Sequence, residues 1–416
     1  MSSESNEVLI VGAGIVGLSV ALQLQLEGFK VTVVDQQEPM QGCSAGNAGY
    51  LSQANIFPPA TPDLLLRFPK LLLASDGPLV ISAAYLGKMI PWSMRAVSSL
   101  QPARYKQTIS AFSSLITRSQ DTLNKLAAVA DASHLLTREG GLIAYRTQQA
   151  LQSKQRLIPV WEEHGIEVQN INAQAMLAME PSLAPDLVGG LFFPNSGRCS
   201  NPRLLGLRYL DHILAAGGRF VSGKVTSIRR NGLAAWDVAI NDSVARVGKV
   251  VVCAGYHSEQ LMEGYGFRKT MVCERGYHLM LPEPQVTLNR PIVFGEPLFA
   301  ATPMQEGLRL AGTAEFCKPT AKPNMERAFM LKNIASQYIP GLGDQGAKPW
   351  IGIRPTLPDG LPAIGEVAPG SGFFYAFGHS HNGLMMSAIT AQCVAALALG
   401  RPAPVDISPL NLQRFN

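Results

Sequence analysis

The chain has 416 residues, which at about 150 residues per domain predicts two or three domains. Hydrophobic residues make up 47% and charged residues 16%, so the chain can bury a large core and is not intrinsically disordered. Neither a glycine period nor a heptad pattern appears, which excludes collagen-like and coiled-coil architectures. The net charge of +5 is small and dispersed, and we therefore expect no nucleic-acid partner.

The N-terminal residues predict a strand, a tight turn, a helix and a second strand. Residues 8–11 form an apolar run, and an apolar helix follows as far as Glu27, where Gly28 can end it by adopting positive φ. Residues 31–35 form the second strand. This order is typical of the first half of a nucleotide-binding α/β unit.

Residues 40–60 are rich in small and polar residues and predict a loop. The next stretch, 61–98, is apolar and interrupted by proline. It also carries four basic residues: Arg67, Lys70, Lys88 and Arg95. Two interpretations stay open for it. It forms a helix pair under a lid, or its Leu, Phe and Trp side chains enter a membrane interface while the basic residues face lipid headgroups.

The remainder of the chain predicts further α/β units. Helices are expected over 107–128, 203–216 and 383–399, strands over 219–228, 249–253, 277–281 and 373–377, and a loop rich in Pro and Gly over 352–365. The last helix includes polar residues, so we interpret it as a core helix and not as a membrane span.

The turn between the first strand and the first helix reads Gly12-Ala13-Gly14-Ile15-Val16-Gly17. Gly12 permits the tight turn, Gly14 lets a pyrophosphate approach the backbone, and Gly17 lets helix and strand pack closely. The helix N-terminus then offers N–H groups to the phosphates. Asp35, 18 residues after Gly17, can accept a hydrogen bond from a ribose hydroxyl, and its charge argues against NADP. The motif predicts a dinucleotide site.

Three further segments favour FAD over NAD. Residues 44–49 are small enough for a flat ring to lie against the backbone, and 250–255 give a second close approach. Residues 378–383 precede a helix whose positive end can face the flavin edge that becomes negative on reduction. His379 and His381 could instead serve in proton transfer, but no carboxylate or Cys stands at ligand spacing, so we expect no metal.

Residues 350–365 read WIGIRPTLPDGLPAIG. With the segments above, they make the chain resemble the D-amino acid oxidase superfamily of FAD-dependent oxidoreductases, and within it the bacterial D-amino acid dehydrogenases. The resemblance implies an α/β fold with a Rossmann-like FAD-binding domain and a substrate domain built on a mixed or antiparallel sheet. The FAD-binding domain is expected from 1–58, 195–262 and 350–416, and the substrate domain from 59–194 and 263–349.

The resemblance also implies which residues contact FAD. They are Gly12, Gly14, Ile15, Val16, Gly17, Asp35, Ser44, Asn47, Ala48, Gly49, Val225, Ala254, Gly255, Gly378, His379, Asn382 and Gly383. Some relatives attach the flavin through a Cys near the Arg-Pro block or through a His in the early loop. Residues 352–360 contain no Cys and 44–49 contain no His, so we expect FAD to be bound non-covalently.

For the substrate, the resemblance implies that Arg354 and Tyr277 orient a carboxylate. A planar, permanently charged guanidinium can bind a carboxylate through two parallel hydrogen bonds. Alternatively, Arg354 is a structural partner of Asp359 or Glu366, and Tyr277 is an aromatic residue of the core. Arg275, next to this tyrosine, is expected to face solvent and is left out of the site.

The expected reaction is oxidative deamination of a free amino acid, with D configuration favoured, by hydride transfer to flavin N5. Electrons would then pass to a membrane quinone or another acceptor other than oxygen. The alternatives are a dehydrogenase or oxidase of cis-4-hydroxy-D-proline, sarcosine or glycine, an oxidase that uses O₂, and, in another class, a non-catalytic FAD-binding subunit of a larger complex.

The six cysteines show no CxxC or other metal-ligand spacing, which favours reduced thiols in the cytoplasm. The run from Val8 to Leu26 carries no charge, but Glu4 and Glu7 precede it where a signal peptide would have Lys or Arg. We therefore expect a cytoplasmic protein, with peripheral contact at the inner face of the plasma membrane if 61–98 binds lipid.

Overall fold

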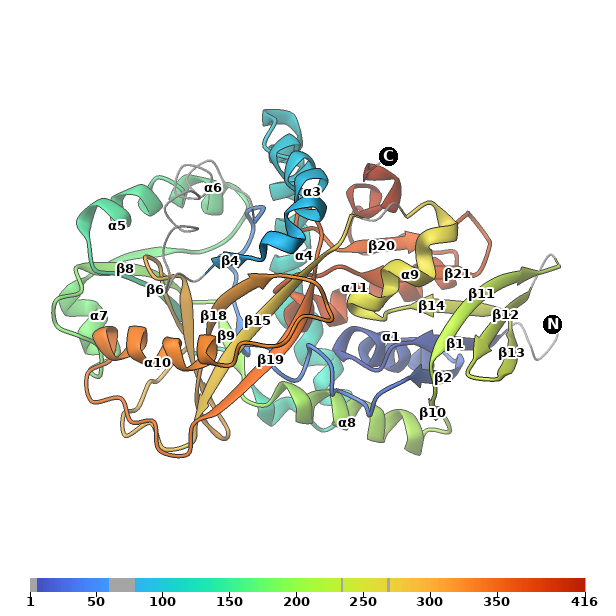
Figure 1. Cartoon of the computed structure of the whole chain (residues 1–416), viewed down its shortest axis with the longest axis horizontal. Coiled ribbons are helices and arrows are strands. Elements are labelled where there is room, and N and C mark those ends of the chain that lie inside the picture. Colours follow the sequence, from blue (N-terminus) through green and yellow to red (C-terminus); the bar gives the residue numbers. More distant parts are fainter. Residues whose placement is uncertain (1–5, 60–78, 233–234, 268–269, 416) are drawn as a thin grey trace.

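The structure is a computed structural model that describes residues 6–59, 79–232, 235–267 and 270–415. The first part of the apolar stretch 61–98 therefore lies outside the described residues. Two large sheets lie at opposite ends of an elongated molecule, with helices between and around them (Figure 1).

The first sheet has six strands drawn from the beginning, the middle and the end of the chain. Its order is β10 (Arg219–Ser222), β2 (Lys30–Asp35), β1 (Glu7–Val11), β14 (Lys249–Val252), β21 (Phe373–Phe377) and β20 (Ala363–Glu366). The strands pair in parallel except for β20, which is antiparallel to β21. This confirms the Rossmann-like α/β unit.

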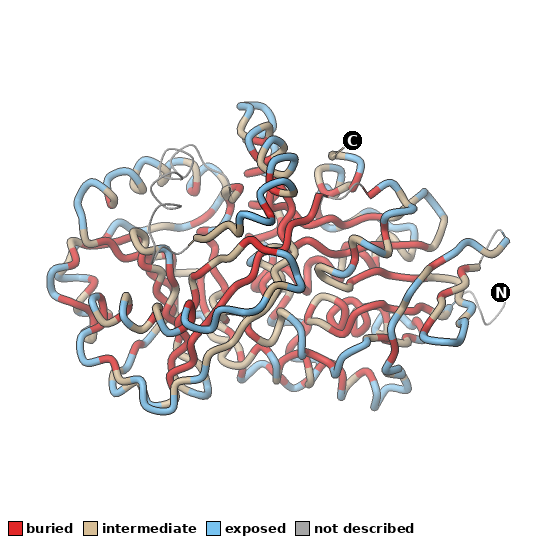
Figure 2. The backbone as a smooth tube through the Cα atoms, viewed as in Figure 1, coloured by how far each residue is buried: buried red, intermediate tan, exposed pale blue. Residues whose placement is uncertain are grey.

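Helices cover one face of this sheet. They are α1 (Ile15–Leu26), α8 (Pro202–Ala215) and α11 (Gly383–Ala398), with α1 against α8 and α11. A further helix, α4 (Pro102–Val129), packs on α11. The other face bears the small antiparallel sheet of β11 (Val225–Asn231), β12 (Ala235–Ile240) and β13 (Ser243–Val247). Each group buries its own core, seen as red tube in Figure 2.

The single strand predicted over 219–228 is wrong. The chain forms β10 in the first sheet and then β11 in the small sheet, and it changes sheets at Gly223 and Lys224. The Gly223 N–H donates to the Asp35 carbonyl oxygen at 2.8 Å, whereas the Lys224 N–H donates to the Asn241 side chain at 2.9 Å. The two neighbouring amides thus bond to different sheets.

The second sheet is mixed, as predicted. Its order is β19 (Lys348–Thr356), β15 (Val272–Leu281), β18 (Gly307–Phe316), β17 (Phe299–Met304), β16 (Ile292–Phe294), β6 (Gly141–Tyr145), β8 (Gly189–Phe193) and β7 (Gln169–Asn172), and β4 (Leu79–Ile81) pairs with β18. Most pairs are antiparallel, and α10 (Glu326–Tyr338) packs on one face.

The loop predicted over 352–365 is only partly correct, because β19 continues to Thr356 and β20 begins at Ala363. Proline is tolerated in β19 because this strand is at the edge of the sheet, where a missing N–H breaks no ladder. β19 also belongs to the second sheet although its sequence lies within 350–416, and α4 packs on the first sheet's helices although it lies within 59–194. The domain boundaries themselves stay a prediction.

The remaining elements are short and lie around the two sheets. They are α3 (Leu86–Ser98), α5 (Gln148–Gln155), α6 (Ile158–Glu163), α7 (Ala173–Met179), α9 (Ser258–Met262), and a small sheet of β3 (Tyr50–Leu51), β9 (Gly197–Cys199) and β5 (Leu136–Thr137). α3 projects from the molecule at the top of Figure 1, next to α4.

Candidate active site

A first cavity of about 380 Å³ opens at the carboxyl ends of β1, β2 and β14. Gly12 lies at its edge with φ of 111°, and a Cβ there would come within 2.5 Å of the Cys253 carbonyl oxygen. A Cβ at Gly17 would overlap the Gly12 carbonyl oxygen. At Gly14, by contrast, only the Ser44 hydroxyl lies near, at 3.1 Å. Gly12 and Gly17 are therefore required by the fold itself, whereas the space beside Gly14 belongs to the cavity.

Two side chains hold the glycine turn in place. The Asp35 carboxylate accepts the Ala13 N–H at 2.7 Å, and the Ser44 hydroxyl accepts the Ile15 N–H at 3.0 Å. Asp35 and Ser44 both line the cavity, so they stabilise the turn and can also contact a bound ligand.

The N-terminus of α11 opens into the same cavity as that of α1. Asn382 precedes α11 but its side chain caps none of the helix N–H groups, and Gly383 lines the cavity. Just before it, Ser380 has φ of 49° and a buried hydroxyl with no hydrogen-bond partner among the described residues. Two helix N-termini and an unpartnered hydroxyl suit a ligand that carries phosphates at one end and gains negative charge at the other.

His379 is buried and is not expected to gain or lose a proton near neutral pH. Its Nε2 lies 3.0 Å from the Thr390 hydroxyl, and burial lowers the pKa of His379 to about 3. The ring is therefore neutral near pH 7.

Most of the expected FAD contacts meet at this cavity. Its lining includes Gly12, Gly14, Ile15, Val16, Asp35, Ser44, Asn47, Val225, Ala254, Gly255, Gly378, His379 and Gly383. Four do not appear in that lining: Gly17 packs against the turn, Gly49 packs against the Cys199 carbonyl, and Ala48 and Asn382 line the neighbouring cavity.

A second cavity, of about 690 Å³, adjoins the first. The two share four lining residues: Cys43, Asn47, Gly352 and Ser380. One wall of the second cavity is the β15–β19 face of the mixed sheet, and another is the inner face of α3, which contributes Met89, Trp92 and Ala96. A ligand that fills the first cavity can therefore end where the second begins.

Arg354 lines the second cavity and pairs with a carboxylate that sequence reasoning missed. It lies directly opposite Glu274, and its Nη1 donates to Glu274 Oε1 at 2.7 Å. Thr356 donates to Glu274 Oε2 at 2.6 Å, and His381 Nε2 donates to Oε1 at 3.1 Å. No acceptor among the described residues bonds Nε or Nη2 of Arg354, which leaves one edge of its guanidinium for a ligand.

The pair carries opposite charges near neutral pH. Burial alone would raise the pKa of the Glu274 carboxyl, but the charges of His381 and Arg354 and the hydrogen bonds hold it well below its usual range. Glycine makes this arrangement possible, because a Cβ at Gly276 would overlap the Arg354 guanidinium. In the sequence, Gly276 two residues after Glu274 was the available signal that a large side chain lies over this part of β15.

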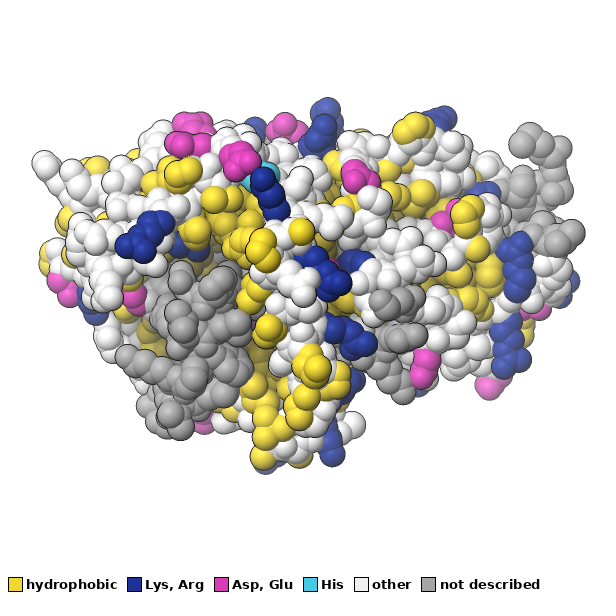
Figure 3. Space-filling model, turned by 90° about the horizontal axis from the view of Figure 1, so that it is seen from above, with side chains coloured by type: hydrophobic (Ala, Val, Ile, Leu, Met, Phe, Trp, Pro, Cys, Tyr) yellow, Lys and Arg dark blue, Asp and Glu magenta, His cyan; other side chains and the backbone are white. Residues whose placement is uncertain are grey.

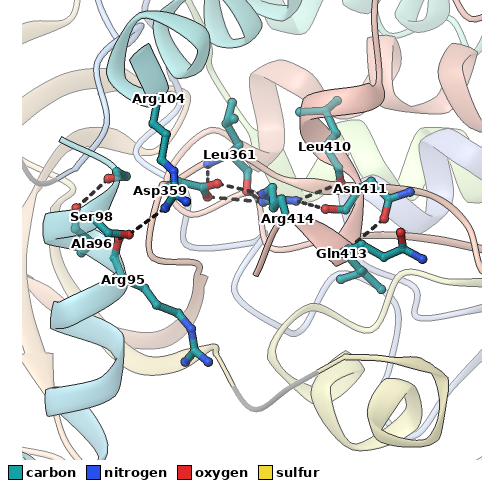
Figure 4. Close-up of polar contacts among 12 residues, drawn as sticks. Arg95, Ala96, Ser98, Arg104, Asp359, Leu361, Leu410, Asn411, Gln413 and Arg414 are labelled. Carbon is teal, nitrogen blue, oxygen red and sulfur yellow. Dashed lines mark hydrogen bonds and ion pairs between the residues drawn. The ribbon is translucent and has the colours of Figure 1, made fainter. Parts of the chain in front are cut away.

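The alternative ion-pair partners expected for Arg354 are engaged elsewhere. Asp359 accepts from Arg414 Nε at 2.7 Å, near the C-terminus of the chain (Figure 4). Glu366 accepts the Gly370 and Gly372 N–H groups at 3.0 and 2.8 Å.

Tyr277 is among the residues that line the second cavity with Arg354, but its hydroxyl is bonded elsewhere, so its expected role at the substrate carboxylate stays a prediction. Side chains alternate between the faces of a strand, and Tyr277 is on the face of β15 opposite to that of Glu274 and Gly276. It packs in the core under α10, and its hydroxyl donates to Glu315 at 2.5 Å. Arg275 shares that face; it is 3% exposed, so its expected position in solvent is wrong.

The early loop is held by two further residues that sequence reasoning missed. Arg309 Nη1 donates to the Asn47 and Ala45 carbonyl oxygens, and His278 Nδ1 donates to that of Gly46 at 3.1 Å. Burial, with the Arg309 charge nearby, lowers the pKa of His278 to about 3. The loop between the two cavities is thus bonded to the mixed sheet through three consecutive carbonyls.

Comparison with known proteins shows the family of this chain. The family model described as FAD dependent oxidoreductase (DAO) matches residues 7–397. The chain belongs to this family. FAD is accordingly its cofactor, and the first cavity, with its two helix N-termini, is the part of the structure that fits it. In the described part of the chain, no group of His, Cys, Asp and Glu side chains could hold a metal ion.

Relatives within the family match along the full chain. A protein of Bradyrhizobium diazoefficiens named D-amino-acid oxidase is 32% identical over 99% of both chains. A D-amino acid dehydrogenase of Vibrio atlanticus is 26% identical over 98% of this chain and 100% of its own. Among solved structures, glycine oxidase from Geobacillus kaustophilus has a TM-score of 0.76 at 22% identity, over 98% of this chain and 99% of that chain, which shows a shared fold.

Proposed function

We propose that this FAD-dependent oxidoreductase catalyses the oxidative deamination of a free amino acid, preferentially of D configuration. The observation that carries the proposal is the free guanidinium edge of Arg354 in a cavity that adjoins the cofactor cavity. A guanidinium with two unengaged donors on one side is the protein group best matched to a carboxylate. The names of the relatives, D-amino-acid oxidase and D-amino acid dehydrogenase, support an amino acid as the owner of that carboxylate.

In this proposal the chain binds and orients while the cofactor accepts electrons. FAD, when bound, takes up the hydrogen and the electron pair that leave the substrate's Cα. Arg354 holds the carboxylate through Nε and Nη2, so that the α-carbon faces the boundary between the cavities. The substrate amine must be neutral at this moment, because its lone pair forms the C=N bond as the hydrogen leaves. A substrate that binds as a zwitterion therefore first gives its ammonium proton to water. Water then adds to the imine, and ammonia and a 2-oxo acid are released.

The substrate's side chain would lie against apolar residues. Away from Arg354, the cavity wall includes Phe57, Ile81, Met89, Trp92, Phe112, Phe299 and Phe316. Burying an apolar side chain there is favourable, so we infer a preference for hydrophobic amino acids over small or acidic ones.

We further propose that electrons pass to a membrane quinone and that α3 contacts the membrane surface. Its outer side exposes Leu86 (50%), Ile90 (61%), Met94 (69%) and Val97 (50%). The sequence from 77 to 120 contains basic residues and no Asp or Glu. Figure 3, seen from the side on which α3 projects, shows hydrophobic side chains gathered beside Lys and Arg. This pattern suits anionic lipid headgroups around an inserted apolar stripe.

The position of α3 links that surface to the active site. Val97 is half exposed and also lines the second cavity, and Trp92 Nε1 donates to the Thr356 carbonyl at 3.3 Å. The contact proposed is peripheral: no helix in the described ranges is long and apolar enough to cross a bilayer.

Anaerobic flavin reduction tests the proposal. Purified FAD-loaded protein is mixed with a library of D- and L-amino acids, together with cis-4-hydroxy-D-proline, sarcosine and glycine, and bleaching of the flavin absorbance is followed. We expect D-amino acids with apolar side chains to bleach fastest. Bleaching by none of them would refute the proposed function. Reoxidation by a soluble quinone analogue, compared with peroxide yield in air, separates a dehydrogenase from an oxidase.

A further inference from the structure

We propose that Glu274 binds the amino group of the substrate, so that Glu274 and Arg354 together form a receptor for a zwitterion. This inference rests on the proposed function and deepens it: it assigns the second end of the substrate to a residue of this chain. Arg354 takes the carboxylate, and the carboxylate of Glu274 takes the α-nitrogen, which is separated from the substrate's own carboxylate by one carbon.

The charges in the second cavity support this assignment. Of the described residues that line it, Glu274 is the one acidic residue, and Arg354 and Lys154 are the permanently charged basic ones. Glu274 is 4% exposed and ionised, as its lowered pKa requires. A buried, ionised carboxylate facing a ligand cavity attracts a positively charged group and repels a negative one.

The Glu274 carboxylate also retains room for a fourth hydrogen bond. An ionised carboxylate offers about four acceptor positions. Three are used: Arg354 and His381 donate to Oε1, and Thr356 donates to Oε2. The remaining position is on Oε2, and since Glu274 lines the cavity, an ammonium or amine N–H placed beside Arg354 can reach it.

The pair explains selectivity that Arg354 alone would not provide. If Arg354 stood alone, any carboxylate would bind, including 2-hydroxy acids and simple organic acids. With Glu274 in contact with Arg354 at 2.7 Å, a ligand that brings only a negative charge meets repulsion. A zwitterion brings both charges, and each meets its opposite.

A merely structural ion pair predicts a different outcome. In that case Glu274 would keep Arg354 in position, and its loss would weaken the binding of every carboxylate ligand alike. In the proposal, loss of the Glu274 charge weakens the binding of zwitterions and strengthens the binding of ligands that carry only a carboxylate. The direction of the change in affinity for plain carboxylates therefore distinguishes the proposal from a structural ion pair.

The test uses a pair of ligands of the same shape, neither of which can be oxidised because neither has an α-hydrogen. 2-Aminoisobutyrate is a zwitterion, and pivalate has a methyl group in place of its ammonium. Dissociation constants are measured from the perturbation of the flavin spectrum in the FAD-loaded wild type and in Glu274→Gln. We expect wild type to favour 2-aminoisobutyrate by at least about tenfold, and Glu274→Gln to lose that preference and bind pivalate more tightly than wild type does.

Glu180→Gln is the matched control. Glu180 is also a buried carboxylate paired with an arginine, Arg290, and it lines neither cavity. This variant should keep the wild-type preference. Weaker binding of both ligands by Glu274→Gln, in equal proportion and with normal flavin content, would overturn the inference in favour of a structural pair. Failure of the proposed function is a separate result: wild-type flavin would then be bleached by no amino acid at all.

Discussion

The two cavities meet at Cys43, Asn47, Gly352 and Ser380, yet they are built in different ways. The cofactor cavity is formed mainly by backbone: a glycine turn, two helix N-termini and strand ends. The substrate cavity is formed by side chains from segments far apart in the sequence, and its charged pair joins residues 80 positions apart. Backbone sites depend on local sequence, whereas side-chain sites depend on how strands align.

This difference explains what could be predicted from the sequence. The glycine turn, Asp35 and the turn before α11 line one cavity, and each could be recognised because it lies within a short continuous segment; their contacts with FAD stay a prediction. Glu274 was missed because only the β15–β19 register brings it opposite Arg354. The orientation of the Tyr277 side chain could not be predicted either, because a motif in one strand does not indicate which face points to the site, and a shift of one residue reverses it.

The loop predicted over 352–365 was only partly correct for a related reason. Proline and glycine usually mark loops, but an edge strand tolerates both. In β19, glycine is even required, because a Cβ at Gly352 would overlap the ring of Trp350. The composition of residues 352–356 therefore reflects close packing at the site, whereas residues 357–362 are the irregular backbone that was predicted.

The largest expected effect distinguishes a glycine that leaves room for the cofactor from a glycine that is needed for folding. Gly14→Val should abolish FAD retention, since its side chain would occupy the cavity where a pyrophosphate approaches the backbone. The apoprotein should remain folded, because a Cβ at Gly14 meets only the Ser44 hydroxyl. Flavin absorbance per protein and circular dichroism measure the two effects. Gly17→Val is the comparison: it should prevent folding, since Cβ overlaps backbone. Full flavin content in Gly14→Val would show that the dinucleotide lies elsewhere.

Arg354→Met tests the substrate cavity. Loss of a buried, charge-assisted contact should lower kcat/KM by about two to four orders of magnitude. Because the variant leaves the buried Glu274 without its arginine partner, Tm should fall as well, while flavin is retained. Arg354→Lys should recover only part of the activity, since an ammonium cannot reproduce the two-pronged geometry. Unchanged steady-state kinetics with a lower Tm would show that Arg354 stabilises the fold and does not bind the substrate.

The membrane surface of α3 can be removed without touching either cavity. Ile90→Glu with Met94→Glu replaces two exposed side chains and should weaken binding to anionic liposomes by at least about tenfold. Dye-linked activity should persist while quinone-linked activity in vesicles falls. Val244→Glu, at an equally exposed apolar position on the small sheet, is the control and should bind liposomes as wild type does. Equal liposome binding by all three proteins would contradict the assignment of α3.

The change with the smallest effect near neutral pH is in the pH dependence of stability, and each cavity contributes one histidine to it. The pKa values of His379 and His278 are both lowered to about 3, so the folded state keeps them neutral while the unfolded chain protonates them below its pKa of about 6.5. The unfolded state thus binds more protons between these values, and stability falls as pH drops from about 6.5 toward 3. Each histidine adds about 1.4 kcal/mol per pH unit in that window.

Urea unfolding at a series of pH values measures this slope. His379→Gln and His278→Gln should each make the dependence shallower, and by similar amounts. A slope between pH 6 and 4 that neither substitution alters would mean that other groups control the acid response.

A crystal structure of the FAD-loaded protein with 2-aminoisobutyrate tests most directly that cofactor and substrate occupy adjoining cavities. We predict the dinucleotide in the cavity at the N-termini of α1 and α11, and the amino acid in the second cavity, with its carboxylate on Arg354 and its nitrogen near Glu274. An amino acid bound on the opposite face of the sheet, beside Arg275 and Glu315, would contradict this account.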